Sequence, residues 1–298
     1  MDFFRIISDL KKSDSSMILY SLLNRIPIII IGVDANEIDD FLIDLSELMH
    51  FRKDLVFYTD FVSMEEYQQL LQNESIDYNS QRTQVRCPCG VSNKSLVNFN
   101  HFDSWIMGFE MKTEKKKIQV LKNYIKSRIP IFLSIQFIFD IVNVELEGIN
   151  SKDFDFTFEQ NVLQKISQDT EKAVIKMKRV LSERIKSEKV DKELVNNLLD
   201  FEVEKQELKK NILKSEIQNF FSASKRAFFI LSRMHLMNSF EMNTRIGSKT
   251  LLETIDYDEA SIERIIAFIN KEWGEDFSEL FENGKKANAL DSMQSLWG

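Results

Sequence analysis

Apolar and polar residues follow two different periods in the first half of the chain. Residues 26–33 form a continuous apolar run, as in a strand that is buried on both faces of a sheet. In residues 35–49, apolar side chains recur every three or four positions, as along one stripe of a helix. Strands that alternate with helices predict an α/β domain with a mainly parallel sheet. Further strand-like runs occupy residues 54–61, 83–89, 105–111 and 129–137.

Local signals mark further elements of this domain. Ser63 and Glu66 have the spacing of a capping box and predict the start of a helix, and residues 115–126 predict a basic helix. The tetrapeptide Arg-Ile-Pro-Ile occurs at 25–28 and again at 128–131. Each copy follows an apolar helical pattern and leads into a strand, where proline is tolerated because its missing N–H falls outside the ladder. We interpret the repeat as two helix-to-strand junctions of the same kind.

The second half of the chain has a helical pattern throughout. Neither glycine nor proline occurs between Gly148 and Gly247. Apolar residues repeat every three or four positions up to a polar break at 187–191, and the repeat then resumes to about residue 242. This pattern predicts two long antiparallel helices that form a coiled-coil-like hairpin, with Lys205 and Ser215 interrupting its apolar seam. The predicted organisation is an α/β domain at 1–148, a helical hairpin at 149–247, and a small helical segment with a tail at 248–298.

Composition limits the classes of partner. The chain has 298 residues, of which 43% are hydrophobic, which is ample for a packed core. A net charge of −8 and a pI near 5.2 argue against a general nucleic-acid binder. The longest apolar stretch, 129–142, is too short to span a bilayer, so we expect no transmembrane segment. The first twelve residues lack the pattern of a secretory signal, and with two cysteines they favour a cytoplasmic setting.

The bend after the first predicted strand is a candidate site for nucleotide binding. A strand, a single glycine, a short turn and an amphipathic helix resemble the phosphate-binding strand–loop–helix of nucleotide-binding α/β proteins. A Walker loop counted from Gly32 would place glycine, lysine and serine or threonine at positions 37 to 39. The chain has Glu37, Ile38 and Asp39 there, with Asp34 and Asp40 beside them.

Carboxylates at these positions would repel a phosphate from the helix N-terminus. Two interpretations follow. The bend is a degenerate, pseudo-NTPase-like loop that has kept a partner surface, or it is an ordinary strand-to-helix turn whose acidic residues favour the helix dipole.

A second candidate site includes Asp103, Glu110 and Lys112. An acidic residue, a Glu-x-Lys pair at a strand end and a following helix resemble metal-dependent nucleases of the PD-(D/E)xK type. That resemblance implies carboxylates that hold magnesium and a lysine that polarises the attacking water. Asp103 lies only seven residues before Glu110, which is close for a hairpin, and a solvated strand end is the alternative interpretation.

A third candidate site is a metal centre at Cys87, Cys89 and His101. Thiolate and imidazole suit zinc, and Asp103 is the nearest fourth ligand. The alternative is that both cysteines are buried free thiols, which is common for this residue type. We expect no bound metal and no cofactor.

Large apolar residues of the second half are candidates for partner binding. Phe220, Phe221 and Phe228 lie on the predicted hairpin, and Leu296 and Trp297 lie in the tail. Aromatic residues and leucine at helical spacing are common anchors in protein interfaces. Docking of the tail onto its own domain is the alternative.

These patterns predict a non-enzymatic protein-interaction or scaffold protein. Its degenerate α/β domain would carry a helical arm that binds a protein partner or a second copy of the chain. Two alternatives stay open. One is an ATPase-like nucleotide-binding enzyme that binds phosphate through backbone amides near Gly32. The other is a metal-dependent nuclease that uses Glu110 and Lys112.

Overall fold

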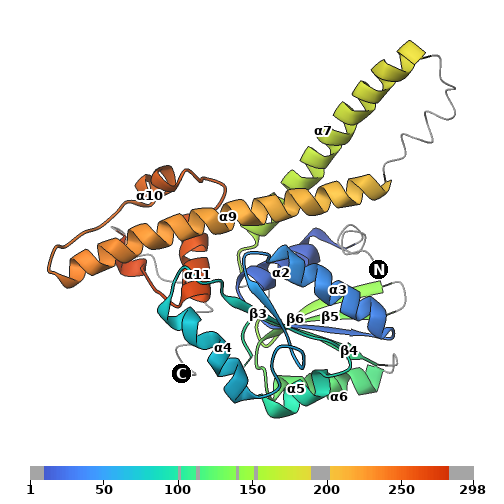
Figure 1. Ribbon diagram of the computed structural model, residues 1–298, viewed down its shortest axis with the longest axis horizontal. Helices are drawn as coiled ribbons and strands as arrows, with labels where there is room; N and C mark the ends of the chain where they lie inside the picture. Colours follow the sequence, from blue (N-terminus) through green and yellow to red (C-terminus); the bar gives the residue numbers. More distant parts are fainter. Residues whose placement is uncertain are drawn as a thin grey trace.

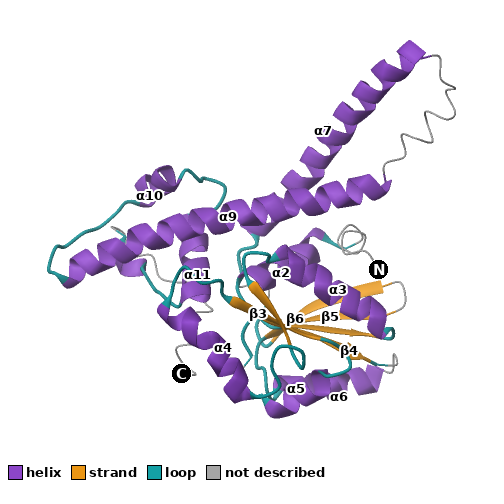
Figure 2. Ribbon diagram, viewed as in Figure 1, coloured by secondary structure: helices purple, strands orange, loops and turns teal. Residues whose placement is uncertain are grey.

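The first half of the chain forms one six-stranded sheet (Figures 1 and 2). The computed structural model describes residues 10–99, 102–111, 115–138, 141–150, 154–188 and 202–281. The strand order is β2-β3-β4-β1-β5-β6, in which all neighbours are parallel except β5 and β6. The predicted mainly parallel α/β sheet, followed by helices, is therefore confirmed. The strands are β1 Ile28–Gly32, β2 Lys53–Val56, β3 Thr83–Cys87, β4 Trp105–Glu110, β5 Phe132–Ile138 and β6 Ile141–Glu147.

Helices cover both faces of this sheet, and the central strand β1 shows why its apolar run is continuous. Ile28 and Ile30 point into one core with the helices α2 and α3, whereas Ile29 and Ile31 point into the opposite core with α5 and α6. Figure 2 shows these layers, with α4 beside α5 and α6. The five helices are α2 Lys12–Leu23, α3 Ala35–Leu48, α4 Met64–Ile76, α5 Ser92–Asn98 and α6 Lys115–Lys126.

Two elements of the first half have weak sequence signals. The edge strand β6 is half-exposed, so its residues do not form the continuous apolar run of a buried strand. The helix α5 has only seven residues and buries Ser92 and Ser95 along with Leu96. Both elements are therefore additions to the predicted set, and both lie in short segments where polar residues occupy buried or half-buried positions.

The second half contains two long helices, α7 Thr157–Glu188 and α9 Glu202–Ser239. They meet near the sheet, where the rings of Phe158 and Phe220 lie 4.5 Å apart. Beyond this contact α7 extends away from the body of the protein and diverges from α9 (Figure 1). The predicted start of the second helix, near residue 190, lies outside the described residues. The remaining elements are α10 Ser248–Ile255, α11 Ile262–Trp273 and the short 3₁₀ helix η2 Ser278–Leu280.

One hydrophobic core joins the three predicted segments. It contains side chains from α2, α3 and the sheet together with others from α7, α9, α10 and α11. Buried ion pairs attach α11, among them Arg264 to Glu159 at 2.7 Å and Glu272 to Arg52 at 2.6 Å. The helical region is thus packed against the sheet through α11 and the base of α7. Within the described residues, no helix is both long enough and apolar enough to cross a membrane.

The end of β6 passes very close to the start of β5. Gly148 has a φ of +87°, and a Cβ at this position would run into the carbonyl oxygen of Pro130. Gly148→Ala should therefore lower the free energy of unfolding by about 2–3 kcal/mol, because backbone strain and a backbone clash add together. Urea denaturation would measure this loss.

Gly274→Ala is the matched control for Gly148→Ala. Gly274 has a similar φ of +78° but has open space where the Cβ would lie. Its replacement should cost only about 1 kcal/mol, which is the strain component alone. Equal losses for the two variants would contradict the close approach of Gly148 to Pro130.

Candidate functional site

The Gly32 bend lies at the carboxyl edge of the sheet and is very short. Only Val33 and Asp34 separate β1 from α3, so this bend has no loop that could wrap a phosphate with backbone N–H groups. The carboxylate of Asp34 caps α3 by accepting the N–H of Asn36 at 2.9 Å. Asp39 likewise accepts the N–H of Cys89 at 2.9 Å. Two of the acidic residues at this bend therefore bind backbone N–H groups of the protein itself.

Ile38 occupies the position that a Walker lysine would have, and it is fully buried. A Cβ at Gly108 would lie 2.7 Å from Ile38 Cγ2, and one at Gly32 would lie 3.2 Å from Ile38 Cδ1. The side chain therefore fills the space where α3 packs on β1 and β4. Glu37 is half-buried beside it.

The structure does not bring the candidate nuclease residues together. Asp103 precedes β4, whereas Glu110 is the last residue of that strand. A strand rises about 3.3 Å per residue, so roughly 20 Å separates the two carboxylates. Asp103 instead lies 3.3 Å from Nε of Arg25, at the opposite edge from Gly32. Lys112 lies outside the described residues.

The two cysteines lie on opposite faces of the sheet. Cys87 belongs to the core under α5 and α6, whereas Cys89 packs against the core under α3. Burial raises the pKa of the Cys87 thiol to about 11, and burial together with Asp39 raises that of Cys89. Both shifts disfavour the thiolate that binds metal. His101 lies outside the described residues, and within them no three His, Cys, Asp or Glu side chains form a group that could hold a metal ion.

Two of the aromatic residues predicted to bind a partner lie in the interior. Phe220 is fully buried and Phe228 is 2% exposed. Phe221 stacks on Phe51 with ring centroids 4.1 Å apart, and Phe228 stacks on Trp273 at 4.9 Å. Phe220 and Phe228 are therefore core residues beneath α11 rather than contact residues, which corrects the expectation for these two, whereas Phe221 is half-buried against the same core. Leu296 and Trp297 lie outside the described residues.

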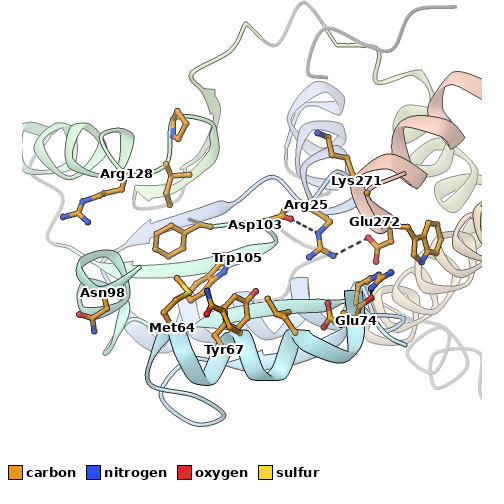
Figure 3. A pocket seen from close by; sticks show the side chains of 18 of the residues that line it. Arg25, Met64, Tyr67, Glu74, Asn98, Asp103, Trp105, Arg128, Lys271 and Glu272 are labelled. Carbon is orange, nitrogen blue, oxygen red and sulfur yellow. Dashed lines mark hydrogen bonds and ion pairs between the residues drawn. The ribbon is translucent and has the colours of Figure 1, made fainter. Parts of the chain in front are cut away.

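A large concave feature lies at the amino edge of the sheet (Figure 3). It is a cavity of about 1130 Å³, bordered by α4, by the end of α11 and by the starts of β1, β3, β4 and β5. We call it the amino-edge pocket. Its lining includes Arg25, Tyr67, Arg82, Trp105, Arg128 and Glu272.

One face of α4 forms a wall of this pocket. The lining residues of α4 recur at spacings of three and four, and Figure 3 shows Met64 and Tyr67 directed toward the sheet. The ring of Tyr67 lies 6.0 Å from that of Trp105, which begins β4. Phe102 meets Trp105 edge to face at 4.8 Å. The pocket therefore has an aromatic wall on the side of β4. The residues that α4 contributes are Met64, Tyr67, Gln68, Leu71 and Glu74.

Arg25 lies at the centre of the pocket in an unusual backbone conformation. It follows the C-cap of α2 with a φ of +59°, where glycine is the usual residue. The N–H of Ile26 donates to Ser21 O at 2.9 Å, as in a Schellman motif. Ser104, also at φ +59°, donates its N–H to the carbonyl oxygen of Arg25 at 2.9 Å. Two neighbouring strand starts thus carry left-handed, non-glycine residues, and such strain is concentrated at functional sites.

A buried ion cluster lies behind Arg25. Arg52 and Glu272 have fully buried side chains and are joined at 2.6 Å. Arg52 also donates to Gln84 Oε1 and to the carbonyl oxygens of Leu22 and Leu23, at the end of α2. Burial would raise the pKa of Glu272, but the charges of Arg52 and Arg25 outweigh it and hold that pKa low. The Glu272 carboxylate therefore stays ionised and balances the buried charge of Arg52.

Sequence reasoning missed this pocket, although one signal pointed to it. Both copies of the Arg-Ile-Pro-Ile repeat begin with an arginine that lines the pocket, Arg25 before β1 and Arg128 before β5. Because β1 and β5 are neighbours, the repeat brings two cations to one edge of the sheet.

Comparisons of the chain with protein-family models, curated protein sequences and solved structures gave no match. The function is therefore inferred from the geometry alone.

Proposed function

We propose that the protein is a non-enzymatic interaction module whose helical arm, α7, pairs with a second copy of the chain. The observation that carries this proposal is a stripe of side chains on α7. Residues at three- and four-residue spacing run along one face of the helix. We call them the arm stripe: Val162, Ile166, Thr170, Ala173, Met177 and Val180.

The arm stripe changes from buried to exposed along the helix. Near the sheet, Val162 and Ile166 are each 4% exposed because they pack against the core that α9 shares. Further out, Met177 and Val180 are each 44% exposed. The helix continues beyond the body of the protein (Figure 1), and its apolar face becomes exposed there. Burial of such a face against another helix is favourable by roughly 25 cal/mol per Å² of apolar surface.

A second copy of the chain is the partner we propose because it supplies a matching surface. Two arms packed side by side would bury the same stripe from both chains, as in an isologous two-fold interface. The Gly32 bend is consistent with a role that does not involve nucleotide turnover, since its lysine position is a core isoleucine.

Aspartate in the outer stripe should weaken association. We expect Met177→Asp with Val180→Asp to raise the dissociation constant of the dimer at least about tenfold, because two charges would enter an apolar contact. Light scattering after size exclusion, over a wide range of protein concentration, would measure the mass.

Ile175→Asp is the matched control for this double variant. Ile175 is 66% exposed on the same helix but lies on the face opposite to the stripe. Ile175→Asp should leave the mass measured by light scattering unchanged. A wild-type protein with the mass of one chain at every concentration would contradict the proposal, and so would equal effects of the stripe and control variants.

A further inference from the structure

We infer that the amino-edge pocket binds a small aromatic molecule that carries an oxyanion, a carboxylate or a phosphate. The inference goes beyond the proposed interaction function because no residue of the pocket belongs to the arm stripe. Three observations carry it: unpaired hydrogen-bond donors, an excess of cationic groups in the pocket, and an aromatic wall.

The unpaired donors belong to three side chains that line the pocket and are at least nine-tenths buried. Trp105 is 1% exposed, Arg82 is 9% exposed and the side chain of Arg25 is 9% exposed. Trp105 Nε1, Arg82 Nε and Arg25 Nη1 have no hydrogen-bond acceptor among the residues that the structure describes. Glu272 Oε2 lies 3.7 Å from Arg25 Nη1, which is beyond hydrogen-bond distance. A buried donor without an acceptor is costly, so an acceptor-rich ligand would relieve all three.

The charge of the pocket favours an anion although the chain as a whole is acidic. Its described lining includes the cationic side chains of Arg25, Arg82, Arg128 and Lys271. Of the three lining carboxylates, Glu272 is bound by Arg52 through Nε and Nη2 at 2.6–3.2 Å, and Asp103 faces Arg25. The third is Glu74, whose Oε1 has no hydrogen-bond donor among the described residues; burial raises its pKa and so disfavours its charged form. Arginine is the side chain best suited to hold carboxylate or phosphate oxygens.

In the structure, the carboxylate of Asp103 occupies the position beside Arg25 that we assign to the ligand oxyanion. Its side chain is 70% exposed, and it meets Arg25 Nε at 3.3 Å (Figure 3). Because the Asp103 side chain is largely solvated, it can turn into water when a ligand oxyanion takes its place beside the buried Arg25. Arg25 also keeps a strained backbone that glycine would relieve, which is expected where the side chain is needed.

The aromatic wall determines the rest of the ligand. Trp105 and Tyr67 line the same pocket as Arg25 (Figure 3), and Phe102 packs against Trp105. A planar ring can stack against or meet these rings edge to face. The volume of about 1130 Å³ is slightly larger than that of most small-molecule sites, so a fused ring system with an oxyanion fits without rearrangement.

Calorimetric titration of the full chain with four probes tests the inference. The probes are 1-naphthyl phosphate, 1-naphthoate, 1-naphthalenemethanol and inorganic phosphate. At least one of the two aromatic oxyanions should bind with a dissociation constant of about 1 mM or lower. The neutral alcohol and inorganic phosphate should each bind at least about tenfold more weakly. The tighter of the two aromatic anions identifies the oxyanion that the pocket prefers.

Substitutions of pocket residues test whether the probes bind in the amino-edge pocket. Arg25→Gly should weaken binding at least about tenfold while the protein stays folded, because glycine suits the left-handed backbone. Trp105→Phe keeps an aromatic ring without the N–H and should weaken binding about threefold or more. Arg233→Gln, at an exposed position of α9 outside the pocket, should change nothing. The inference is overturned by absence of binding of both aromatic anions, by equal binding of the alcohol, or by a folded Arg25→Gly variant with unchanged affinity.

Discussion

Glu272→Gln is expected to lower the free energy of unfolding by about 3–5 kcal/mol, because it leaves the charge of Arg52 buried without a partner. Both side chains are fully buried and lie 2.6 Å apart. The remaining acceptors of Arg52, Gln84 Oε1 and the carbonyl oxygens at the end of α2, are neutral. They cannot replace a carboxylate. Urea denaturation monitored by circular dichroism would measure the loss.

Glu253→Gln is the control for that substitution. Glu253 is 67% exposed and pairs with Lys249 at 3.7 Å along α10. Its loss should change the free energy of unfolding by no more than about 0.5 kcal/mol, as for other exposed pairs. A loss below about 1 kcal/mol for Glu272→Gln would show that Arg52 finds other compensation and would contradict the predicted role of the pair.

The lowered pKa of Glu272 also predicts how the destabilisation by Glu272→Gln depends on pH. The pKa of Glu272 is lowered from its ordinary value of 4.5. A lowered folded-state pKa means that the stabilisation is present above the unfolded-state value and is lost as the pH falls through the folded-state value. The difference in unfolding free energy between the wild type and Glu272→Gln should therefore shrink below about pH 4. A constant difference down to lower pH would contradict this role.

The sheet could be predicted because its signals are local. Ile28 to Ile31 supply both cores from one uninterrupted run, and the capping box at Ser63 begins α4 as expected, with Ser63 Oγ accepting the N–H of Glu66. The same local reasoning misjudged Phe220 and Phe228. An apolar stripe on a long helix without glycine indicates an exposed hairpin seam, but α11, about 40 residues further along, covers that stripe in the fold.

The amino-edge pocket could not be predicted because its residues meet only in three dimensions. Arg52 and Glu272 are 220 positions apart. The face of α4 that lines the pocket contains Tyr67, Gln68 and Glu74, which in sequence resemble a solvated helix surface. Arg25 is marked in the sequence only as the first residue of the Arg-Ile-Pro-Ile repeat. Nothing in the repeat shows that the backbone of Arg25 is left-handed.

Ile38→Lys, which places lysine at the Walker position, is expected to destabilise the protein by at least about 4 kcal/mol and to confer no nucleotide binding. Ile38 is fully buried, and its side chain fills the contact between α3 and Gly108. An ammonium group there would lose its hydration without gaining a phosphate, because only two residues connect β1 to α3. Thermal unfolding with and without ATP and magnesium would test both parts of this prediction.

Glu37→Lys introduces the same residue one position earlier and serves as the control. Glu37 is half-buried at the surface of α3, so this variant should stay within about 1 kcal/mol of the wild type. Calorimetry with ATP and GTP should detect no binding at the bend in either protein. Any nucleotide binding that Arg25→Gly abolishes belongs to the amino-edge pocket. Micromolar nucleotide affinity that survives Arg25→Gly but changes in Glu37→Lys would show that the bend at Gly32 holds phosphate after all, and an ATPase-like activity would then replace the interaction module as the better proposal.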